Sequence, residues 1–328
     1  MSRFWEIRGH FREGRARLAE LLALPAASAP TVGRARVLDG AGVMAMYQLD
    51  FASARVLLRE SLELYRQNQH LRGVAWVLIH LGWMSHDRGR YKAARRFLNT
   101  ALAVCNQIDD QRGVARCLIL LGMMAAAELD LSAAGSYLEQ SLALNREAGD
   151  WWGAAWALDS LGRMRLADAE LRQADACLAQ ELLEEGVAIW RELGERRHLA
   201  YSIADLATCT ARGGDVALAW TQLAEALRTF TDLQDTEGKR YALWNCARLL
   251  TCEGKYLQSA LVLGAISGYE RATGKLIWCG ALLGQRHLES LRRSVDPELV
   301  ARAFADGEAI SLNDAIAQAH PLLRVLVS

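Results

Sequence analysis

Aromatic and arginine side chains recur at one position of a repeated segment of this chain, and side chains of these types often dominate binding surfaces. Successive members lie 40, 40, 40, 45 and 40 residues apart, and they are Arg36, Trp76, Arg116, Trp156, Tyr201 and Tyr241. One to two helical turns further along the same helices, aromatic or arginine residues occur again, at Trp83, Arg163, Trp244 and Arg248. We predict that these residues line a groove for a protein or peptide partner, with a small molecule as the alternative ligand. The competing interpretation is that several of the tryptophans pack between neighbouring helices.

Side chains that could perform acid–base or covalent chemistry lack the neighbours that such chemistry needs. His80 and His86 are six residues apart, without a cysteine or carboxylate at metal-ligand spacing. Cys246 and Cys252 have no nucleophile context, and the glycines fall at repeat turns rather than in a phosphate-binding loop. Adjacent pairs of acids point in different directions along a helix. We therefore predict no enzymatic activity and no catalytic, cofactor-binding or metal-binding residues.

Small residues mark the elements that must position the groove, because they recur with the same period. One set is Gly42, Gly82, Gly122, Gly162, Ala207 and Ala247, and a second is Ala54, Ala94, Ala134, Ala179, Ala219 and Ser259. At Gly82 a side chain would meet the neighbouring helix, and overfilling such a contact costs about 1–3 kcal/mol. A period of this size predicts a solenoid, whose units bury their apolar faces by stacking on their neighbours.

Each repeat has the pattern of a helical hairpin. Within residues 73–112, apolar residues at helical spacing predict a first helix, here called helix A, that ends near Asp87, and Gly89 supplies the turn. The second helix, helix B, is predicted from Tyr91 to about Ile108. All four prolines lie outside the regular array, at Pro25, Pro30, Pro297 and Pro321.

The leucine–glycine pair in helix A, the aromatic residue after the turn and the small residue three positions later resemble the tetratricopeptide repeat. HEAT and armadillo repeats have similar periods, so the residues rather than the length carry the resemblance. It covers about residues 3–274, with units about six residues longer than the usual 34 or so and without the closing proline, which longer helices would explain. The resemblance implies an all-α, helical-hairpin solenoid that winds into a right-handed superhelix.

We predict three parts along the chain. Residues 1–32 form a leading helical hairpin and linker, residues 33–273 form six tetratricopeptide-like repeats, and residues 274–328 form a helical cap. In the cap, Asp296 before Pro297 has the residue types of a helix start, and Ser311 begins another such pattern.

The repeat that contains Gly162 has the one change of period. Gly162 and Asp175 are 13 residues apart, whereas the equivalent Gly42 and Asp50 are 8 apart. Five residues have therefore been inserted, and we place them within residues 168–173, where they lengthen helix A or form a longer connection. A tolerated surface insertion is favoured over a docking element, because added loop length costs little.

The bulk composition excludes several classes of protein. The chain has 38 basic and 38 acidic residues, and arginines alternate with acids along most helices, so we expect no direct nucleic-acid binding. The N-terminus has no secretory-signal pattern, and the longest apolar stretches are shorter than a membrane span. Seven cysteines without a Cys-x-x-Cys pair indicate free thiols. We expect a cytoplasmic protein.

Three strings give a more specific resemblance. Residues 3–15 (RFWEIRGHFREGR), 261–265 (LVLGA) and 304–316 (FADGEAISLNDAI) are similar to the C-terminal sensor region of bacterial signal-transducing ATPases and LuxR-type regulators. That resemblance implies a sensing or interaction module, here without the ATPase and DNA-binding domains of such regulators. We expect an adaptor that binds a protein partner, and the alternative is a domain that senses a small-molecule inducer.

Overall fold

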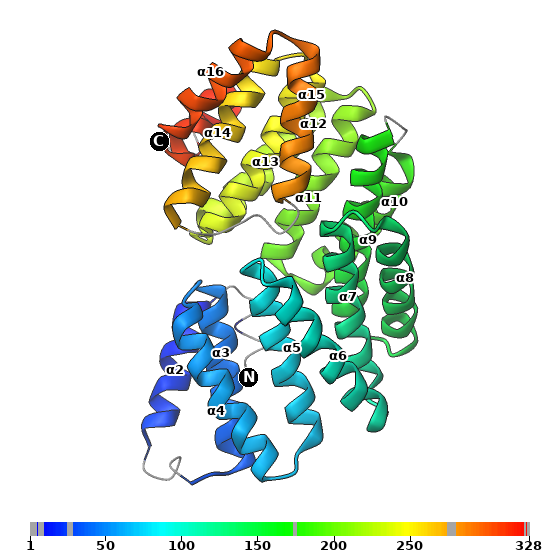
Figure 1. The fold of residues 1–328 in the computed structure, drawn as a ribbon, viewed down its shortest axis with the longest axis vertical. Helices are drawn as coiled ribbons and strands as arrows, with labels where there is room; N and C mark the ends of the chain where they lie inside the picture. Colours follow the sequence, from blue (N-terminus) through cyan, green and yellow to red (C-terminus); the bar gives the residue numbers. More distant parts are fainter. Residues whose placement is uncertain are drawn as a thin grey trace. The chain divides into compact units, whose positions relative to one another are not determined.

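The computed structural model describes Trp5 and residues 10–24, 29–172, 176–273, 280–324 and 326, and these residues form helices and no strand (Figure 1). The predicted linker at residues 25–28 and the end of the predicted insertion, residues 173–175, lie outside the described residues. The helices of the repeats are α2 (Phe11–Ala23), α3 (Val32–Tyr47), α4 (Phe51–Gln67), α5 (Leu71–Asp87), α6 (Tyr91–Gln107), α7 (Gln111–Ala127), α8 (Leu131–Glu147), α9 (Trp151–Arg172), α10 (Cys177–Leu193), α11 (Arg196–Arg212), α12 (Val216–Asp232), α13 (Thr236–Cys252) and α14 (Tyr256–Thr273).

Helix α5 ends at Asp87 and α6 runs from Tyr91 to Gln107, close to the bounds that the sequence pattern predicts. Asp50, Asp215 and Asp235 each accept a hydrogen bond from the backbone N–H three residues later, which satisfies one of the free donors at a helix start. Between α5 and α6, Gly89 takes a left-handed conformation with φ of 65°, which permits the tight turn. The prediction of consecutive helical hairpins is confirmed.

The periodic small residues lie where helices approach each other closely. A Cβ atom at Gly82 would come within 2.8 Å of Leu98 Cγ, and one at Gly162 within 2.7 Å of Leu183 Cγ. The alanine set lies equally deep, since the side chains at Ala54, Ala94 and Ala134 are fully buried. Close packing therefore depends on the absence of side-chain volume at these positions.

A second glycine set, at the first turn of helix A, makes room for the end of the preceding helix B. A Cβ atom at Gly73 would overlap the ring of Tyr65, and one at Gly238 would overlap the ring of Phe230. In the fifth repeat the equivalent residue is His198, whose ring stacks on Trp190 with centroids 5.0 Å apart.

The chain divides into two compact units. The N-terminal unit contains Met1–Met124 and Ser136–Ala154, and the C-terminal unit contains Ala125–Gly135 and Ala155–Ser328. Within each unit, consecutive helices lie side by side (Figure 1). The part boundaries predicted at residues 32 and 273 remain predictions.

Four further helices follow the repeats in the C-terminal unit, and they are α15 (Gly280–Ser294), α16 (Pro297–Glu308), α17 (Leu312–Ala319) and α18 (Pro321–Arg324). The side chains of Asp296 and Ser311 cap α16 and α17, as the sequence predicts. Helix α16 packs closely on α14, because a Cβ atom at Gly307 would overlap the backbone carbonyl of Leu261. This packing covers the apolar side of α14.

The inserted residues lengthen α9, the helix A that contains Gly162. Helix α9 has 22 residues, whereas α5, α7, α11 and α13 have 17 each. Ala169 in the added turn is 6% exposed and belongs to the hydrophobic core of the C-terminal unit. The expectation of a tolerated surface insertion is therefore wrong, because the added turn packs against neighbouring repeats.

Candidate functional site

The predicted groove residues fall into two sets, one in each unit. Arg36, Trp76, Trp83 and Arg116 belong to the N-terminal unit. The C-terminal unit contains Trp156, Arg163, Tyr201, Tyr241, Trp244 and Arg248. The first set is exposed or half-buried, whereas four members of the second set, Trp156, Tyr241, Trp244 and Arg248, are buried.

In the N-terminal unit, the predicted residues are held by polar and stacking contacts that leave part of each side chain accessible. Arg36 is exposed on α3. The indole Nε1 of Trp76 donates to Asp110 Oδ2 over 3.1 Å. Arg116 lies over the ring of Trp152, with its guanidinium carbon 4.4 Å from the ring centroid, a cation–π arrangement.

Trp83 continues a line of aromatic rings that the sequence did not reveal. The rings of Phe11 and Tyr47 stack with centroids 4.5 Å apart, and Tyr47 meets Trp83 edge-on at 5.4 Å. All three side chains are half-buried. We call Phe11, Tyr47 and Trp83 the aromatic row. Because the three occupy different positions of the repeat, no single column of the period contains them.

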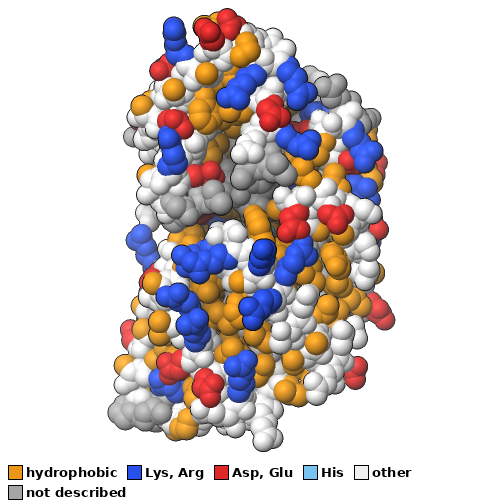
Figure 2. Space-filling view, in the orientation of Figure 1, with side chains coloured by type: hydrophobic (Ala, Val, Ile, Leu, Met, Phe, Trp, Pro, Cys, Tyr) orange, Lys and Arg blue, Asp and Glu red, His pale blue; other side chains and the backbone are white. Residues whose placement is uncertain are grey.

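Basic side chains gather beside the end of α5 and on the outer sides of α4 and α6. Helix α6 contains no acidic residue, and the guanidinium of Arg88 lies 5.8 Å from the ring centroid of Phe51, the first residue of α4. In the described part of the chain, no ion pair involves the six exposed residues of this basic surface, Arg55, Arg59, Arg88, Arg90, Lys92 and Arg96. Figure 2 shows basic side chains gathered on the face of the N-terminal unit around α4 and α5.

The even alternation of charge expected along most helices therefore fails in this region, although the whole chain is neutral. The local density of basic residues could have revealed this surface, since residues 88–96 contain five basic residues and no acid. A neutral total cannot reveal such a segregation of charge.

In the C-terminal unit, the predicted residues take part in a buried polar network. Tyr241 donates its hydroxyl hydrogen to Asp205 Oδ1 over 2.5 Å, and Arg163 Nε lies 2.9 Å from Asp205 Oδ2. Burial raises the pKa of Asp205, an effect that Arg163 opposes. Tyr201 packs against Tyr241 with ring centroids 4.9 Å apart. The network therefore ties α9, α11 and α13 together, with the charges facing each other rather than water.

A second buried acid, Asp159, is also held by hydrogen bonds from neighbouring side chains. Asp159 accepts a hydrogen bond from Trp190 Nε1 over 2.7 Å and another from the Ser202 hydroxyl over 2.7 Å. Burial raises its pKa to about 6, against the opposing effect of Arg163. Trp156, which is 6% exposed, lies edge-on to His198 in the same region.

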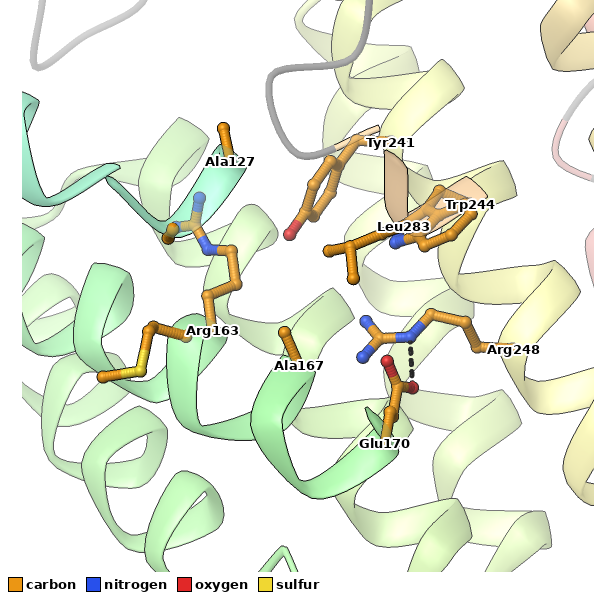
Figure 3. A pocket seen from close by; sticks show the side chains of 10 residues that line it. Ala127, Arg163, Ala167, Glu170, Tyr241, Trp244, Arg248 and Leu283 are labelled. Atoms are coloured by element: carbon orange, nitrogen blue, oxygen red, sulfur yellow. Dashed lines mark hydrogen bonds and ion pairs between the residues drawn. The ribbon is translucent and has the colours of Figure 1, made fainter. Parts of the chain in front are cut away.

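Four of the predicted residues meet around one pocket of the C-terminal unit, namely Arg163, Tyr241, Trp244 and Arg248. The space there amounts to about 430 Å³ when open solvent is included, and its apolar lining includes Met164 and Leu283. Figure 3 shows Arg163 and Arg248 on opposite sides, with Glu170 below them.

Glu170 belongs to the added turn of α9, and its carboxylate accepts a hydrogen bond from Arg248 Nε over 2.8 Å. Asn245 accepts a second bond from the same guanidinium over 3.0 Å. The inserted turn thus supplies the only acid among the described residues that line the pocket. Sequence reasoning located the insertion but not this role, because the two partners are 78 residues apart.

The remaining reactive side chains form no recognisable site among the described residues. No group of three metal-ligating side chains is present there. His80 Nδ1 lies 2.7 Å from Asp39 Oδ1, a carboxylate on the adjacent helix A. The six cysteines of the described part are free, and burial raises the pKa of Cys209 to about 12, which disfavours the reactive thiolate. In the same part of the chain, every helix is too short or too polar to cross a bilayer.

Comparison with known proteins supports the repeat assignment. Residues 33–107 and 73–147, together about a third of the chain, match the model of the tetratricopeptide repeat family. A search of curated proteins found no match. Among solved structures, the crystal structure of BtubC (BKLC) from P. vanneervenii is similar, with 18% identity, a TM-score of 0.48, and coverage of 70% of this chain and 91% of that chain.

Proposed function

We propose that this chain is a non-enzymatic, cytoplasmic scaffold that binds a protein partner on its N-terminal unit, as the sensor or adaptor part of a bacterial regulatory system. Tetratricopeptide repeats generally mediate protein–protein interaction, and residues 33–147 carry the family match. Helical-repeat folds of this kind typically bind rather than catalyse. The bacterial regulatory setting rests on the similarity of residues 3–15 and 304–316 to regulator sensor regions.

The aromatic row is the observation that carries this proposal. Its three rings are partly exposed and already ordered by mutual stacking, so a partner would gain contact area without ordering flexible side chains. Trp76 and Arg116 are also both partly exposed and ordered. Trp76 is held by Asp110, and Arg116 is held by Trp152. Tryptophan, tyrosine and arginine are the residues that most often dominate the affinity of protein interfaces.

The basic surface indicates the charge of the partner. Arg88 and Arg90 follow the end of α5, only five and seven residues after Trp83, so the basic surface and the aromatic row meet there. Because no acid of the described residues forms an ion pair with its six cations, the partner should present acidic side chains opposite. Such pairing would raise the association rate and make binding sensitive to salt.

A capture experiment tests the protein-binding surface. Immobilised full-length chain is incubated with bacterial lysate, and the bound proteins are quantified against chain concentration for wild type, Trp83→Ala and Trp151→Ala. Trp151 is the matched control, since it is a 53% exposed tryptophan of the same unit outside the aromatic row. We expect Trp83→Ala to weaken capture by about tenfold or more, the scale of a hot-spot residue, and Trp151→Ala to leave it unchanged.

Two results would contradict the proposal. Equal loss of capture in both tryptophan variants would show that the aromatic row has no special role. Loss of the bound material on nuclease treatment would replace the protein partner by nucleic acid. A third variant, Arg55→Glu with Arg59→Glu, is expected to weaken capture and reduce its salt dependence. Trp156 is unsuitable for this test, because its burial means that its removal would report on packing.

The pocket supports a second candidate function, the sensing of a small molecule by the C-terminal unit. In its lining, buried charged groups stand beside apolar walls, the combination that small-molecule sites use to orient and hold a ligand. Thermal unfolding with sugars, nucleotides and amino acids tests it, because a ligand at 100 times its dissociation constant stabilises the folded state by about 2.7 kcal/mol. Absence of any shift across the panel would exclude sensing of these classes.

A further inference from the structure

The polar groups around the pocket of the C-terminal unit are mostly donors. The guanidinium groups of Arg163 and Arg248 lie in its walls, with side chains 11% and 6% exposed. Trp244 adds an indole N–H, and no group of the described residues accepts a hydrogen bond from it. Figure 3 shows this nitrogen on the pocket side of the ring, beside Leu283.

Of the two acids that pair with these arginines, only one lines the pocket. Asp205, the partner of Arg163, stands behind the wall and does not line the pocket. Glu170 does line it, and its carboxylate occupies Arg248. The lining therefore carries two guanidinium groups and one carboxylate, and a ligand carboxylate that took the place of Glu170 on Arg248 would leave that guanidinium paired.

We infer that this pocket binds a small carboxylate that carries an apolar body. The carboxylate would accept hydrogen bonds from Arg248 and from the indole N–H of Trp244, since a guanidinium presents its donors in a planar fork that matches a carboxylate. The apolar body would lie against Trp244, Leu283 and Met164. This inference rests on the proposed sensing function and names its ligand class.

Glu170, in the added turn of α9, would compete with a ligand carboxylate for Arg248. Glu170 holds the same guanidinium that the ligand would need, and its side chain is 24% exposed, so it can move aside into water. Ligand binding would therefore exchange one carboxylate for another on Arg248. That exchange predicts that removing the charge of Glu170 strengthens ligand binding, which an ordinary packing contact would not do.

Benzoate is a suitable probe, with benzamide as the uncharged molecule of nearly the same shape and inorganic phosphate as an anion without an apolar body. Binding to the full-length chain is measured by thermal unfolding and by titration calorimetry at constant ionic strength. We expect benzoate to raise the unfolding temperature, and benzamide and phosphate to have little effect. Equal shifts with benzoate and benzamide, or no binding of benzoate, would overturn the inference.

Two mild variants test the contacts and leave the buried Arg163–Asp205 ion pair intact, whose loss would destabilise the fold. Trp244→Phe keeps the ring but removes the donor, and it should weaken benzoate binding about three- to tenfold. Glu170→Gln should strengthen it about threefold or more. Glu181→Gln, which removes the same charge from an exposed position on α10, should change nothing. Unchanged or weaker binding in Glu170→Gln would refute the proposed exchange.

The outcomes separate this inference from the sensing function. A shift with a sugar or nucleotide and none with benzoate would leave sensing intact and discard the carboxylate. If no compound shifts the unfolding temperature, both the sensing function and the carboxylate ligand are refuted.

Discussion

Replacing Gly238 by alanine tests whether the second glycine set exists to make room for a buried ring. Gly238 is in the first turn of α13, and a new Cβ atom would lie 2.5 Å from Phe230 Cε1 and Cγ and closer still to Cδ1. Phe230 is fully buried, so its rigid ring cannot turn away. Overpacking of this kind costs about 1–3 kcal/mol, while replacing a helical glycine by alanine gains about 0.5–1 kcal/mol.

Gly33 provides the matched control, because it also lies in the first turn of a helix A. A Cβ atom there would meet only Thr31 Oγ1, at 3.6 Å, an ordinary van der Waals contact. We expect Gly33→Ala to stabilise the protein by about 0.5–1 kcal/mol, and Gly238→Ala to be about 1–3 kcal/mol less stable than that control.

The assay is thermal unfolding of both variants followed by circular dichroism, with each compared to wild type. One kcal/mol corresponds to a shift of about 2–4 °C in a chain of around 200 residues, and somewhat less in a longer one. A Gly238→Ala protein as stable as Gly33→Ala would show that the repeat can expand at this contact. The reasoning about packing would then be refuted.

Two further predictions concern charge. Burial lowers the pKa of His287 to about 4, an effect that Glu170 opposes, so this residue should make stability fall as pH drops from 6.5 to 4, by up to about 3 kcal/mol. His287→Gln should remove that part of the pH dependence in urea unfolding at pH 4, 5, 6 and 7, and identical slopes in the two proteins would contradict it. Arg90 precedes α6 without a side-chain cap, whereas Asp50 caps α4, so Arg90→Asp should raise stability by about 1 kcal/mol. Arg59→Asp makes the same charge change inside a helix, and equal effects of the two substitutions would exclude capping as the cause.

The repeat architecture was predictable from sequence because each unit repeats the same local requirements. Gly82 and its equivalents are small since the helix axes approach closely there, and that requirement recurs once in every hairpin. Turn and cap residues are similarly local: Gly89 takes a left-handed conformation and Asp296 caps its own helix. A period is therefore enough to identify the packing side of each helix.

The candidate sites were only partly predictable, because a column fixes a side chain's place in the repeat and not its burial. Tyr241 and Trp76 occupy the same column, yet Tyr241 is buried against Asp205, whereas Trp76 stays half-exposed beside Asp110. The difference comes from the acid that each neighbouring repeat happens to present. The aromatic row was invisible for a related reason, since Phe11, Tyr47 and Trp83 come from three different columns.

The sequence by itself determined the helical hairpins, their period, their packing residues and the position of the insertion, because these depend on interactions within one repeat or between adjacent ones. Only the tertiary structure decided that Ala169 of the inserted turn is buried and that Glu170 reaches Arg248, 78 residues later. A five-residue extension adds about 7.5 Å to a helix, so Glu170 and its carboxylate lie beyond the length of a 17-residue helix A such as α11. Where that carboxylate arrives depends on how successive repeats stack, and no single segment of sequence encodes that arrangement.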